Sequence, residues 1–352
     1  MSTIPAFAAR LLRASCRAYA VATVARLRHE RPELLAKGLP ATFAQPEDDV
    51  EVRMLQLAAA LEFDRELLLE HAAAWYKVAF HHRGVHADYL PDSLQAMAAV
   101  LDEELPPEAA RVVRRHLLRA IAAAERAPAD VPSHLDLGAP HGRLAAQVLM
   151  AILEGRGDDA IDALRAATAA GLTVADAHDH VLVPVQQESG RMWLMGEIPI
   201  ADEHYGSGIL DRALCMLQEQ LPRPAPGAKV VATMGVAGNL HDLGIRMVAQ
   251  RLQGAGFAVL HLGGNLPESD LEWAFTDRRI DLVALSATMA LHLHSLAGSI
   301  ATVRRITQGR VPVLVGGEPF RIVADLGARV GADAAAFDAQ GAVAMAQRLV
   351  GR

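Results

Sequence analysis

Hydrophobic residues recur at spacings of three and four along the first third of the chain. The pattern runs from Phe7 to about Arg126 and is clearest in VRMLQLAAALEFDRELLLEHAAAWYKVAF and ARVVRRHLLRAIAAAERA. This spacing is the 3.6-residue period of amphipathic helices. We therefore expect an all-α first domain over residues 1–130.

The next stretch is punctuated by proline and glycine. The segment APADVPSHLDLGAP, residues 127–140, is typical of a linker or exposed loop. Helical periodicity then returns from Gly142 to Gln220, with breaks at 155–157, 171–173 and 196–199. Four helices joined by short breaks predict a four-helix bundle over residues 141–222.

The period changes again after the proline-rich connector LPRPAPG, residues 221–227. The strand-like runs VVATMGV, FAVLHLG, DLVALSA and VPVLVGG alternate with helical segments at 243–254, near 268–275 and up to about 307. Such alternation implies right-handed crossovers and a parallel, doubly wound sheet. The expected third domain, residues 228–352, is a Rossmann-like, flavodoxin-like α/β domain.

Composition narrows the functional classes. A net charge of −7 disfavours nucleic acid as a direct partner, because such binding depends on neutralising phosphates. The two cysteines, Cys16 and Cys215, build neither a disulfide framework nor a multi-cysteine metal site. The N-terminal apolar stretch is interrupted by arginines, and no segment has the apolar length of a membrane span. A cytoplasmic protein is expected.

Loops beyond the carboxyl ends of parallel strands usually hold the ligand. Here the first such loop carries a histidine between glycines, the third has a serine and a threonine, and the fourth has a glycine pair. A further glycine follows the second strand-like run. The candidate residues are Gly238, Asn239, Leu240, His241, Asp242, Leu243, Gly244, Gly264, Ser286, Thr288, Gly316 and Gly317.

These loops together resemble the signature of the cobalamin-binding domain family, D-x-H-x-x-G, then S-x-L or S-x-T, then G-G. The intervals also match, with 41 residues (245–285) between the first two elements and 27 (289–315) between the last two. The resemblance implies that His241 supplies the lower axial nitrogen to the cobalt of cobalamin, in place of the cofactor's benzimidazole.

The resemblance also assigns the neighbouring residues. Ser286 and Thr288 would line the pocket for the nucleotide tail, and Gly316 and Gly317 would let the backbone pass close to it. Asn239 stands where the family usually has a carboxylate that accepts a hydrogen bond from the histidine. An amide oxygen can accept that bond but cannot take the proton, so we expect His241 to be a less basic ligand than in corrinoid enzymes.

The end of the predicted bundle, SGRMWLMGEIPIADEHYGSGILDRAL, resembles the helical cap of the CarH-type light-dependent regulators. Trp193, Glu203 and His204 match the W-x9-EH pattern of that cap. The resemblance implies that the indole covers a 5′-deoxyadenosyl group while the carboxylate and imidazole hydrogen-bond to it. Adenosylcobalamin is therefore favoured over methylcobalamin. Leu194 replaces a histidine that captures the cobalt in some of these proteins, so water or another histidine must do so here.

The first domain shows no recognition helix with a basic face. The segment LEFDRELLLEHAAAWYKVAFHHRGVHADYLPDSLQAMAAVL resembles globin-like sensor domains, and the three parts together resemble the photocobilins, which bind biliverdin beside adenosylcobalamin. Cations for two propionates and polar or aromatic groups for the pyrroles are offered by Trp75, Tyr76, His81, His82, Arg83 and His86. The alternative is that these residues form a solvated helix end above an ordinary core.

The expected function is light sensing without catalysis. Photolysis of the cobalt–carbon bond would change domain contacts or light-dependent homo-oligomeric assembly, with a downstream signalling protein as a further partner and no nucleic acid or membrane. The alternatives are a corrinoid carrier for methyl transfer and a partner-binding antirepressor or signalling scaffold whose first domain binds haem or nothing. A cobalamin mutase is disfavoured, because the chain is helical as far as Gln220 and leaves no room for a substrate barrel.

Overall fold

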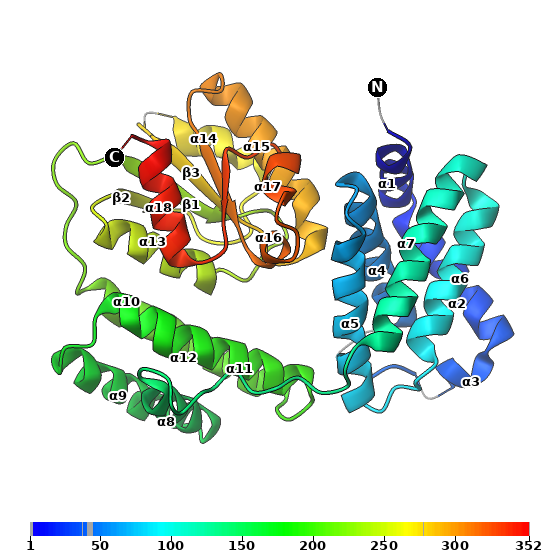
Figure 1. Ribbon diagram of the computed structural model, residues 1–352, viewed down its shortest axis with the longest axis horizontal. Coiled ribbons are helices and arrows are strands. Elements are labelled where there is room, and N and C mark those ends of the chain that lie inside the picture. Colours follow the sequence, from blue (N-terminus) through cyan, green and yellow to red (C-terminus); the bar gives the residue numbers. More distant parts are fainter. Residues whose placement is uncertain (1–2, 37, 41–44, 277, 352) are drawn as a thin grey trace. The chain divides into compact units, whose positions relative to one another are not determined.

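The computed structural model describes residues 3–36, 38–40, 45–276 and 278–351. The chain divides into two compact units. The first comprises Met1–Val131 with two short segments, Met289–His294 and Arg321–Arg329, and the second comprises the remainder. Figure 1 shows the N-terminal helices in blue and cyan, the middle helices in green and the α/β region in yellow to red.

The N-terminal region is entirely helical where it is described, as predicted. Two of its helices begin with a proline: Pro46 and Pro107 lie in the first turns of α4 and α7. The N–H groups of a first helical turn have no partner within the helix, so proline loses no helical hydrogen bond there. Its helices are α1 (Ile4–Ala14), α2 (Cys16–Glu30), α3 (Pro32–Leu35), α4 (Pro46–Glu62), α5 (Glu66–His82), α6 (Tyr89–Glu104) and α7 (Pro107–Arg126).

The middle region forms a helical cap whose apolar core also includes Met247 of the C-terminal region. Its helices are α8 (Gly142–Leu153), α9 (Gly157–Ala169), the continuous run α10 (Val174–Ala177), η2 (His178–Leu182) and α11 (Val183–Leu194), and α12 (Ile200–Gln218). Counting the continuous run as one, four helices make up the described part of this cap, as predicted. The breaks fall where the glycine and proline clusters predicted them.

The long helix of the cap contains one π-helical turn, η2, which directly precedes α11. Pro184, in the first turn of α11, has no N–H to donate to the carbonyl of His180 four residues earlier. A π-turn, in which the backbone hydrogen bonds join residues five apart and not four apart, accommodates such a missing donor. Turns of this kind often occur at functional positions. The turn places His178 at the irregularity.

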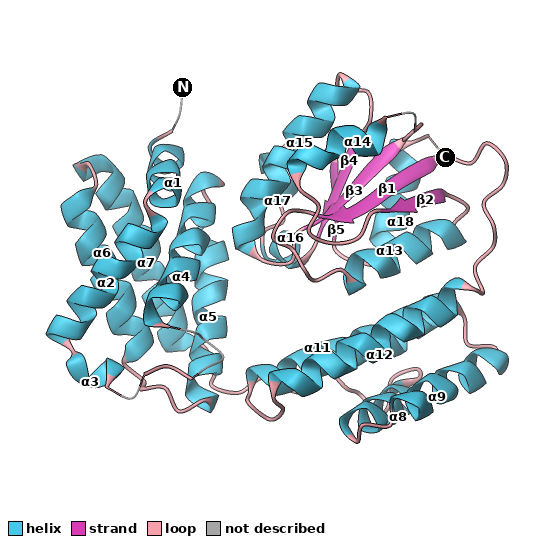
Figure 2. Ribbon diagram, turned by 180° about the vertical axis from the view of Figure 1, so that it is seen from behind, coloured by secondary structure: helices cyan, strands magenta, loops and turns pink. Residues whose placement is uncertain are grey.

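The C-terminal region is the predicted parallel sheet with helices on both faces (Figure 2). Its strands have the order β2-β1-β3-β4-β5 and are all parallel, which is the flavodoxin-like arrangement. The strands are β1 (Val230–Gly235), β2 (Ala258–His261), β3 (Leu282–Ser286), β4 (Val313–Gly316) and β5 (Ala334–Ala336).

The sheet is covered on one face by α13 and α18, which pack against each other, and on the other by α14 and α15 (Figures 1 and 2). The helical segments are α13 (Leu243–Gly254), η3 (Glu268–Asp270), α14 (Leu271–Phe275), η4 (Ala290–His292), α15 (Leu293–Thr307), α16 (Glu318–Ile322), α17 (Leu326–Arg329) and α18 (Ala339–Leu349). None of the described helices combines the length and apolar character needed to cross a membrane.

Candidate functional site

The carboxyl ends of four strands finish in a row of small residues. In the register of the sheet, Gly235 of β1 pairs with Ser286 of β3, Ser286 with Gly316 of β4, and Gly316 with Ala336 of β5. Small side chains at consecutive strand ends leave space above the sheet edge, where ligands of doubly wound sheets bind. Two of the predicted site residues, Ser286 and Gly316, are therefore brought side by side.

The loop after β1 is fastened to its neighbours through Asn239, which is fully buried. The Nδ2 of Asn239 donates to the carbonyl oxygen of Ser286 at 3.0 Å, and the carbonyl oxygen of Asn239 accepts from the backbone N–H of Asn265 at 2.9 Å. Gly238, with a φ of 83°, donates its N–H to Oδ1 of Asn265 at 2.7 Å. These bonds hold the loop on the ends of β2 and β3.

His241 lies at the end of this loop, exposed, two residues before α13 begins. Its ring makes no hydrogen bond to the part of the chain that the structure describes, so both ring nitrogens are accessible. Its backbone N–H donates to Oδ1 of Asn239 at 3.3 Å. We expected the Asn239 amide to accept from the imidazole. That contact is not formed in the structure, where Oδ1 of Asn239 accepts from the backbone N–H of His241 and not from its ring.

Two glycines of the site are required by close approach of the backbone. A Cβ on Gly317, whose φ is 117°, would lie 2.0 Å from the carbonyl oxygen of Ala287. A Cβ on Gly264 would lie 3.0 Å from the carbonyl oxygen of Asn239. Gly244 has open space where its side chain would be. Gly317 and Gly264 therefore pack the loops together, and Gly244 leaves room beside His241.

The remaining predicted residues of this edge differ in exposure. Leu240 is 75% exposed. Asp242 is the N-cap residue of α13 but makes no capping hydrogen bond through its side chain. Leu243 and Thr288 are partly buried.

The predicted residues of the cap form a hydrogen-bonded group at the start of α12. Oε2 of Glu203 is 2.8 Å from Nδ1 of His204, and Oε1 of Glu203 accepts from Oγ of Ser207 at 2.9 Å. Nε2 of Gln186, on α11, donates to the same Oε1 at 3.4 Å. The carboxylate of Glu203 is thereby held between the two helices, while His204 remains exposed.

Trp193 belongs to the same side of α11 as Gln186. The two residues are seven apart, which is two helical turns, and Trp193 is partly buried. Leu194, which stands in place of a histidine, is buried. Sequence reasoning missed Gln186 and Ser207. Their positions, seven residues before the tryptophan and four after Glu203, are the signal by which helical periodicity finds them.

The six residues predicted to bind a bilin are not brought together as one polar site. Tyr76 is buried in the helical core, edge to face with Trp75. Nε2 of His82 is 3.0 Å from the carbonyl oxygen of Ala129.

The other three lie around the C-terminal end of α5. Arg83 donates to the carbonyl oxygen of Ala79 at 3.2 Å, and Nδ1 of His86 accepts from the backbone N–H of Asp88 at 3.2 Å. His81 is exposed and its ring lies edge to face with that of His82. Only the histidines and Arg83 share this helix end.

Comparison with known proteins agrees with the geometry of the sheet edge and the cap. A B12 binding domain model matches residues 229–346, and a second B12 binding domain model matches residues 144–218. The dimethylamine corrinoid protein of Methanosarcina barkeri is 30% identical over 172 residues, which are 48% of this chain and 76% of that protein.

Two further similarities extend this result. The HTH-type transcriptional repressor CarH of Myxococcus xanthus is 26% identical over 182 residues, covering 52% of this chain and 60% of CarH. The structure of the Methanosarcina barkeri monomethylamine corrinoid protein superposes with a TM-score of 0.51 at 21% identity, over 60% of this chain and 100% of that one. At this identity the structural likeness shows the fold alone.

The fold and the site define a corrinoid-binding α/β domain with a helical cap. The chain belongs to the family of B12 binding domain proteins that includes the corrinoid proteins and CarH, and it is a cobalamin-binding protein. The open row of small residues and the accessible imidazole of His241 fit a corrinoid with a nitrogen ligand.

Proposed function

We propose that this protein is a light sensor that uses adenosylcobalamin. The observation that carries the proposal is the polar group on the cap, in which Glu203 is fixed by Gln186 and Ser207 and presents the exposed His204. A methyl ligand offers no hydrogen bond to a carboxylate or an imidazole, whereas the ribose and base of an adenosyl group offer several. The aromatic ring of Trp193 adds a stacking surface of the kind that bases prefer.

Each residue has a definite task in this proposal. His241 would hold the cobalt from below, and Asn239 would keep the His241 loop on the sheet edge. Bound adenosylcobalamin supplies a cobalt–carbon bond that light can break. Trp193, Glu203 and His204 would contact only the adenosylated form, so their contacts are lost when the adenosyl group leaves. A ligand shifts an equilibrium between two conformations only through such differential contacts.

The output would be a change in domain contacts or in self-association, without catalysis of a substrate reaction. A light-dependent homo-oligomer and a downstream signalling protein are the proposed partners. Neither requires direct contact with nucleic acid.

The N-terminal helical region would add a second pigment. By its resemblance to globin-like domains in photocobilins, we propose that it binds biliverdin, with Arg83, His81 and His86 at the end of α5 contacting the propionates. Addition of biliverdin should produce a protein-bound red absorption band, which His81→Ala with His86→Ala should weaken. A Soret-type band of purified protein would instead indicate haem and favour the signalling scaffold.

A corrinoid carrier for methyl transfer is the second candidate. The comparisons favour it over the sensor, because dimethylamine corrinoid proteins recur among the relatives of this chain. A carrier must expose the upper face of the corrin to a partner enzyme. A carrier therefore has no need for a fixed polar group such as that around Glu203. Because of this group we propose the light sensor in preference to the carrier.

The deciding experiment is an absorption spectrum of the protein loaded in the dark with adenosylcobalamin or methylcobalamin, followed by illumination and size-exclusion chromatography. The sensor requires preference for adenosylcobalamin, spectral conversion in light and a change in elution. Trp193→Ala should weaken adenosylcobalamin binding by about 1–3 kcal/mol, as loss of one stacking ring does elsewhere. Preference for methylcobalamin with unchanged elution would establish the carrier.

His241→Ala serves as the control for cobalamin itself. It removes the nitrogen ligand and should change the visible spectrum of either cobalamin form, while His71→Ala, an exposed histidine on α5, should leave the spectrum unchanged.

A further inference from the structure

The cap contacts the α/β domain through one buried polar connection on α13. Gln250 of α13 is 5% exposed, and His178 in the π-turn of the cap is fully buried. Oε1 of Gln250 is 2.8 Å from Nε2 of His178, and Nε2 of Gln250 donates to the carbonyl oxygen of Leu214 on α12 at 2.7 Å. One side chain of α13 therefore joins two helices of the cap.

The hydrogen bonds fix the proton on His178. Only the NH2 group of Gln250 can donate to the Leu214 carbonyl, so its oxygen faces the imidazole and accepts from Nε2–H. Nδ1 is then the unprotonated nitrogen, and it has no hydrogen-bond partner in the described part of the chain. Burial lowers the pKa of His178 to about 4, so the ring stays neutral at ordinary pH. The connection is neutral and incompletely satisfied, which makes it less costly to rearrange than an ion pair.

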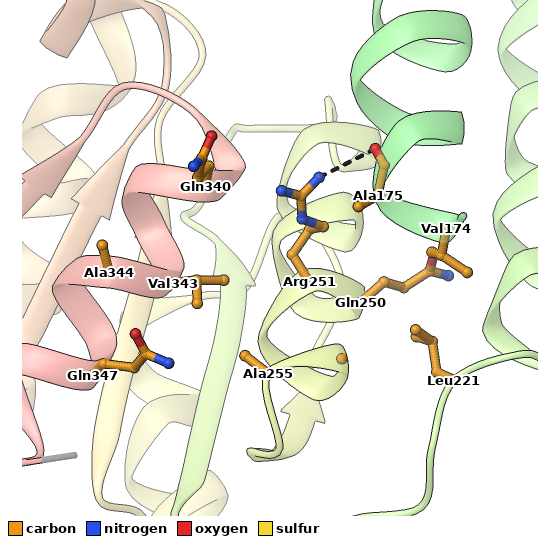
Figure 3. A pocket seen from close by; sticks show the side chains of 11 residues that line it. Val174, Ala175, Leu221, Gln250, Arg251, Ala255, Gln340, Val343, Ala344 and Gln347 are labelled. Carbon is orange, nitrogen blue, oxygen red and sulfur yellow. Dashed lines mark hydrogen bonds between the residues drawn. The ribbon is translucent and has the colours of Figure 1, made fainter. Parts of the chain in front are cut away.

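Two hollows lie next to this connection, and Met247 of α13 packs into the apolar core of the cap beside it. One hollow of about 500 Å³ lies between α10, α13 and α18 and is lined by Gln250, Arg251, Leu221 and Val343 among others (Figure 3). A second hollow of about 250 Å³ is lined by Gln250, Cys215 and His261 among others. Gln250 lines both. A close-packed interface resists turning, whereas an interface with unfilled space beside it can turn by closing that space.

The chain segment that connects the cap to the sheet lies beside the same contact. Leu221, the third residue after α12, lines the larger hollow, and the carbonyl oxygen of Pro222 accepts from Nε2 of Gln253 on α13 at 3.1 Å. The other polar contacts across this interface lie at its rim. They include Arg251 with Asp179 at 2.8 Å and with the carbonyl oxygen of Ala175 at 3.2 Å, shown as the dashed line in Figure 3. The side chain of Arg251 is 14% exposed and that of Asp179 is 41% exposed, so solvent screens this ion pair in part.

Trp193 lies beyond His178 on the same continuous helical run. At a rise of about 1.5 Å per residue the separation is roughly 22 Å, so a turn of about 10° at His178 would displace Trp193 by about 4 Å. The start of α13, in turn, lies two residues after His241. A small rotation at this contact is therefore amplified at the residues that would meet the upper ligand.

We propose that the His178–Gln250 contact is the pivot on which the cap turns relative to the sheet, and that it positions Trp193 and Glu203 over the cobalamin edge. His178 and Gln250 are positioning residues in this scheme and do not touch the cofactor. The positioning role rests on the proposed function of the cap, whereas the pivot itself is a property of the protein and is measurable without cofactor.

The test compares the wild-type chain with His178→Phe combined with Gln250→Leu, which removes both side chains of the His178–Gln250 hydrogen bond together, while the Leu214 carbonyl loses the Gln250 donor. The matched control is Gln218→Ala, because Gln218 donates to Gln253 of α13 at 2.7 Å across the exposed rim of the same interface. Spin labels are placed at Gln187→Cys on α11 and Ala301→Cys on α15, both exposed, in a Cys215→Ser background. Cys16 is buried and its thiol pKa is raised to about 11, so it does not compete for label.

Two quantities are measured: the distribution of the label-to-label distance, and the ratio of affinities for adenosylcobalamin and hydroxocobalamin in the dark. The pivot predicts a broadened distance distribution and about a tenfold loss of adenosyl preference in the double variant, within the usual range of coupling between sites. Gln218→Ala should change neither. If the double variant does not fold, Gln250→Met, which preserves volume, should give the same changes at smaller amplitude.

An unchanged distance distribution in the variant overturns the pivot. A broadened distance distribution together with an unchanged preference for adenosylcobalamin overturns the proposal that this contact positions Trp193. If the wild-type protein shows no preference for adenosylcobalamin, the proposed function fails, and the distance measurement still decides whether the contact is a pivot.

Discussion

Two buried polar clusters in this protein differ in charge. In the N-terminal region, Arg53 of α4 is 1% exposed and pairs with Asp49 one turn earlier at 2.5 Å. Between the cap and the sheet, His178 and Gln250 form a neutral hydrogen bond. The first cluster carries full charges inside one helical region, and the second carries none where two regions meet.

The charged cluster is surrounded by polar and aromatic side chains, although Oδ1 of Asp49 and Nε of Arg53 have no hydrogen-bond partner in the described part of the chain. Nη1 of Arg53 donates to Oγ of Ser93 at 2.5 Å, and the hydroxyl of Tyr89 donates to Oδ2 of Asp49 at 3.0 Å. The guanidinium also lies over the rings of Tyr76 and Tyr89, at 5.7 and 5.6 Å from their centroids. Burial by itself lowers the pKa of Arg53, but the Asp49 carboxylate raises it above its ordinary value.

This contrast indicates where each kind of contact is useful. A buried charge that loses its partner is strongly destabilising, so an ion pair suits a region that must keep one arrangement of its helices. A neutral hydrogen bond costs less to break and suits a contact between parts that turn against each other. Three measurements on the two clusters test this interpretation.

The largest effect is expected for Arg53→Met. It leaves the Asp49 carboxylate buried without its partner and should lower the free energy of unfolding by about 3–5 kcal/mol. Denaturant unfolding followed by Trp75 fluorescence, in a background with Trp193→Phe and Trp273→Phe, reports on this region alone. Asp49→Leu combined with Arg53→Met should recover most of the loss. Equal losses in the single and double variants would mean that packing, and not charge, dominates the cluster.

A smaller effect is expected from acid on the cap contact. The folded-state pKa of His178 is lowered to about 4 by burial, with Arg251 adding to the lowering, so the unfolded chain binds the proton more tightly. The contribution to stability is complete above the unfolded pKa of about 6.5 and is lost as the pH falls toward 4, by about 3 kcal/mol in total. Unfolding at pH 7 and pH 4.5 should show a steeper loss for wild type than for His178→Leu. Parallel pH profiles would mean that this ring does not cause the acid sensitivity.

The smallest effect is expected for Gln250→Met. It leaves Nε2–H of His178 without an acceptor but leaves no charge unpaired, so a loss of about 1–3 kcal/mol is expected. Gln218→Ala, at the exposed rim, should stay within about 0.5 kcal/mol of wild type. The measurement is the denaturation midpoint of the second compact unit, followed through Trp193 in a background with Trp75→Phe and Trp273→Phe. A loss as large as that of Arg53→Met would remove the contrast between the two clusters.

The three-part organisation and the cobalamin-binding loops could be predicted from the sequence. The periods that distinguish helices from strands are local properties, and they predicted the helical N-terminal region, the cap and the parallel sheet. The same periods indicated which loops meet at one edge of a doubly wound sheet. The resemblance to the cobalamin-binding signature then assigned the residues after β1, β3 and β4 to a cobalamin site. The glycines could be assigned to this edge before their close contacts were known.

The pairing of the polar side chains, in contrast, depended on tertiary packing. Arg53 and Tyr89 lie 36 residues apart, and His178 and Gln250 lie 72 residues apart, on helices whose relative rotation no local pattern specifies. For the same reason the predicted bilin residues divide between the helical core, with Tyr76, and the exposed end of α5, with His81 and His86. Asn239 bonds to the backbone and not to the imidazole of His241. A buried polar group without a hydrogen-bond partner is energetically costly, so it pairs with whichever group the packing brings within reach.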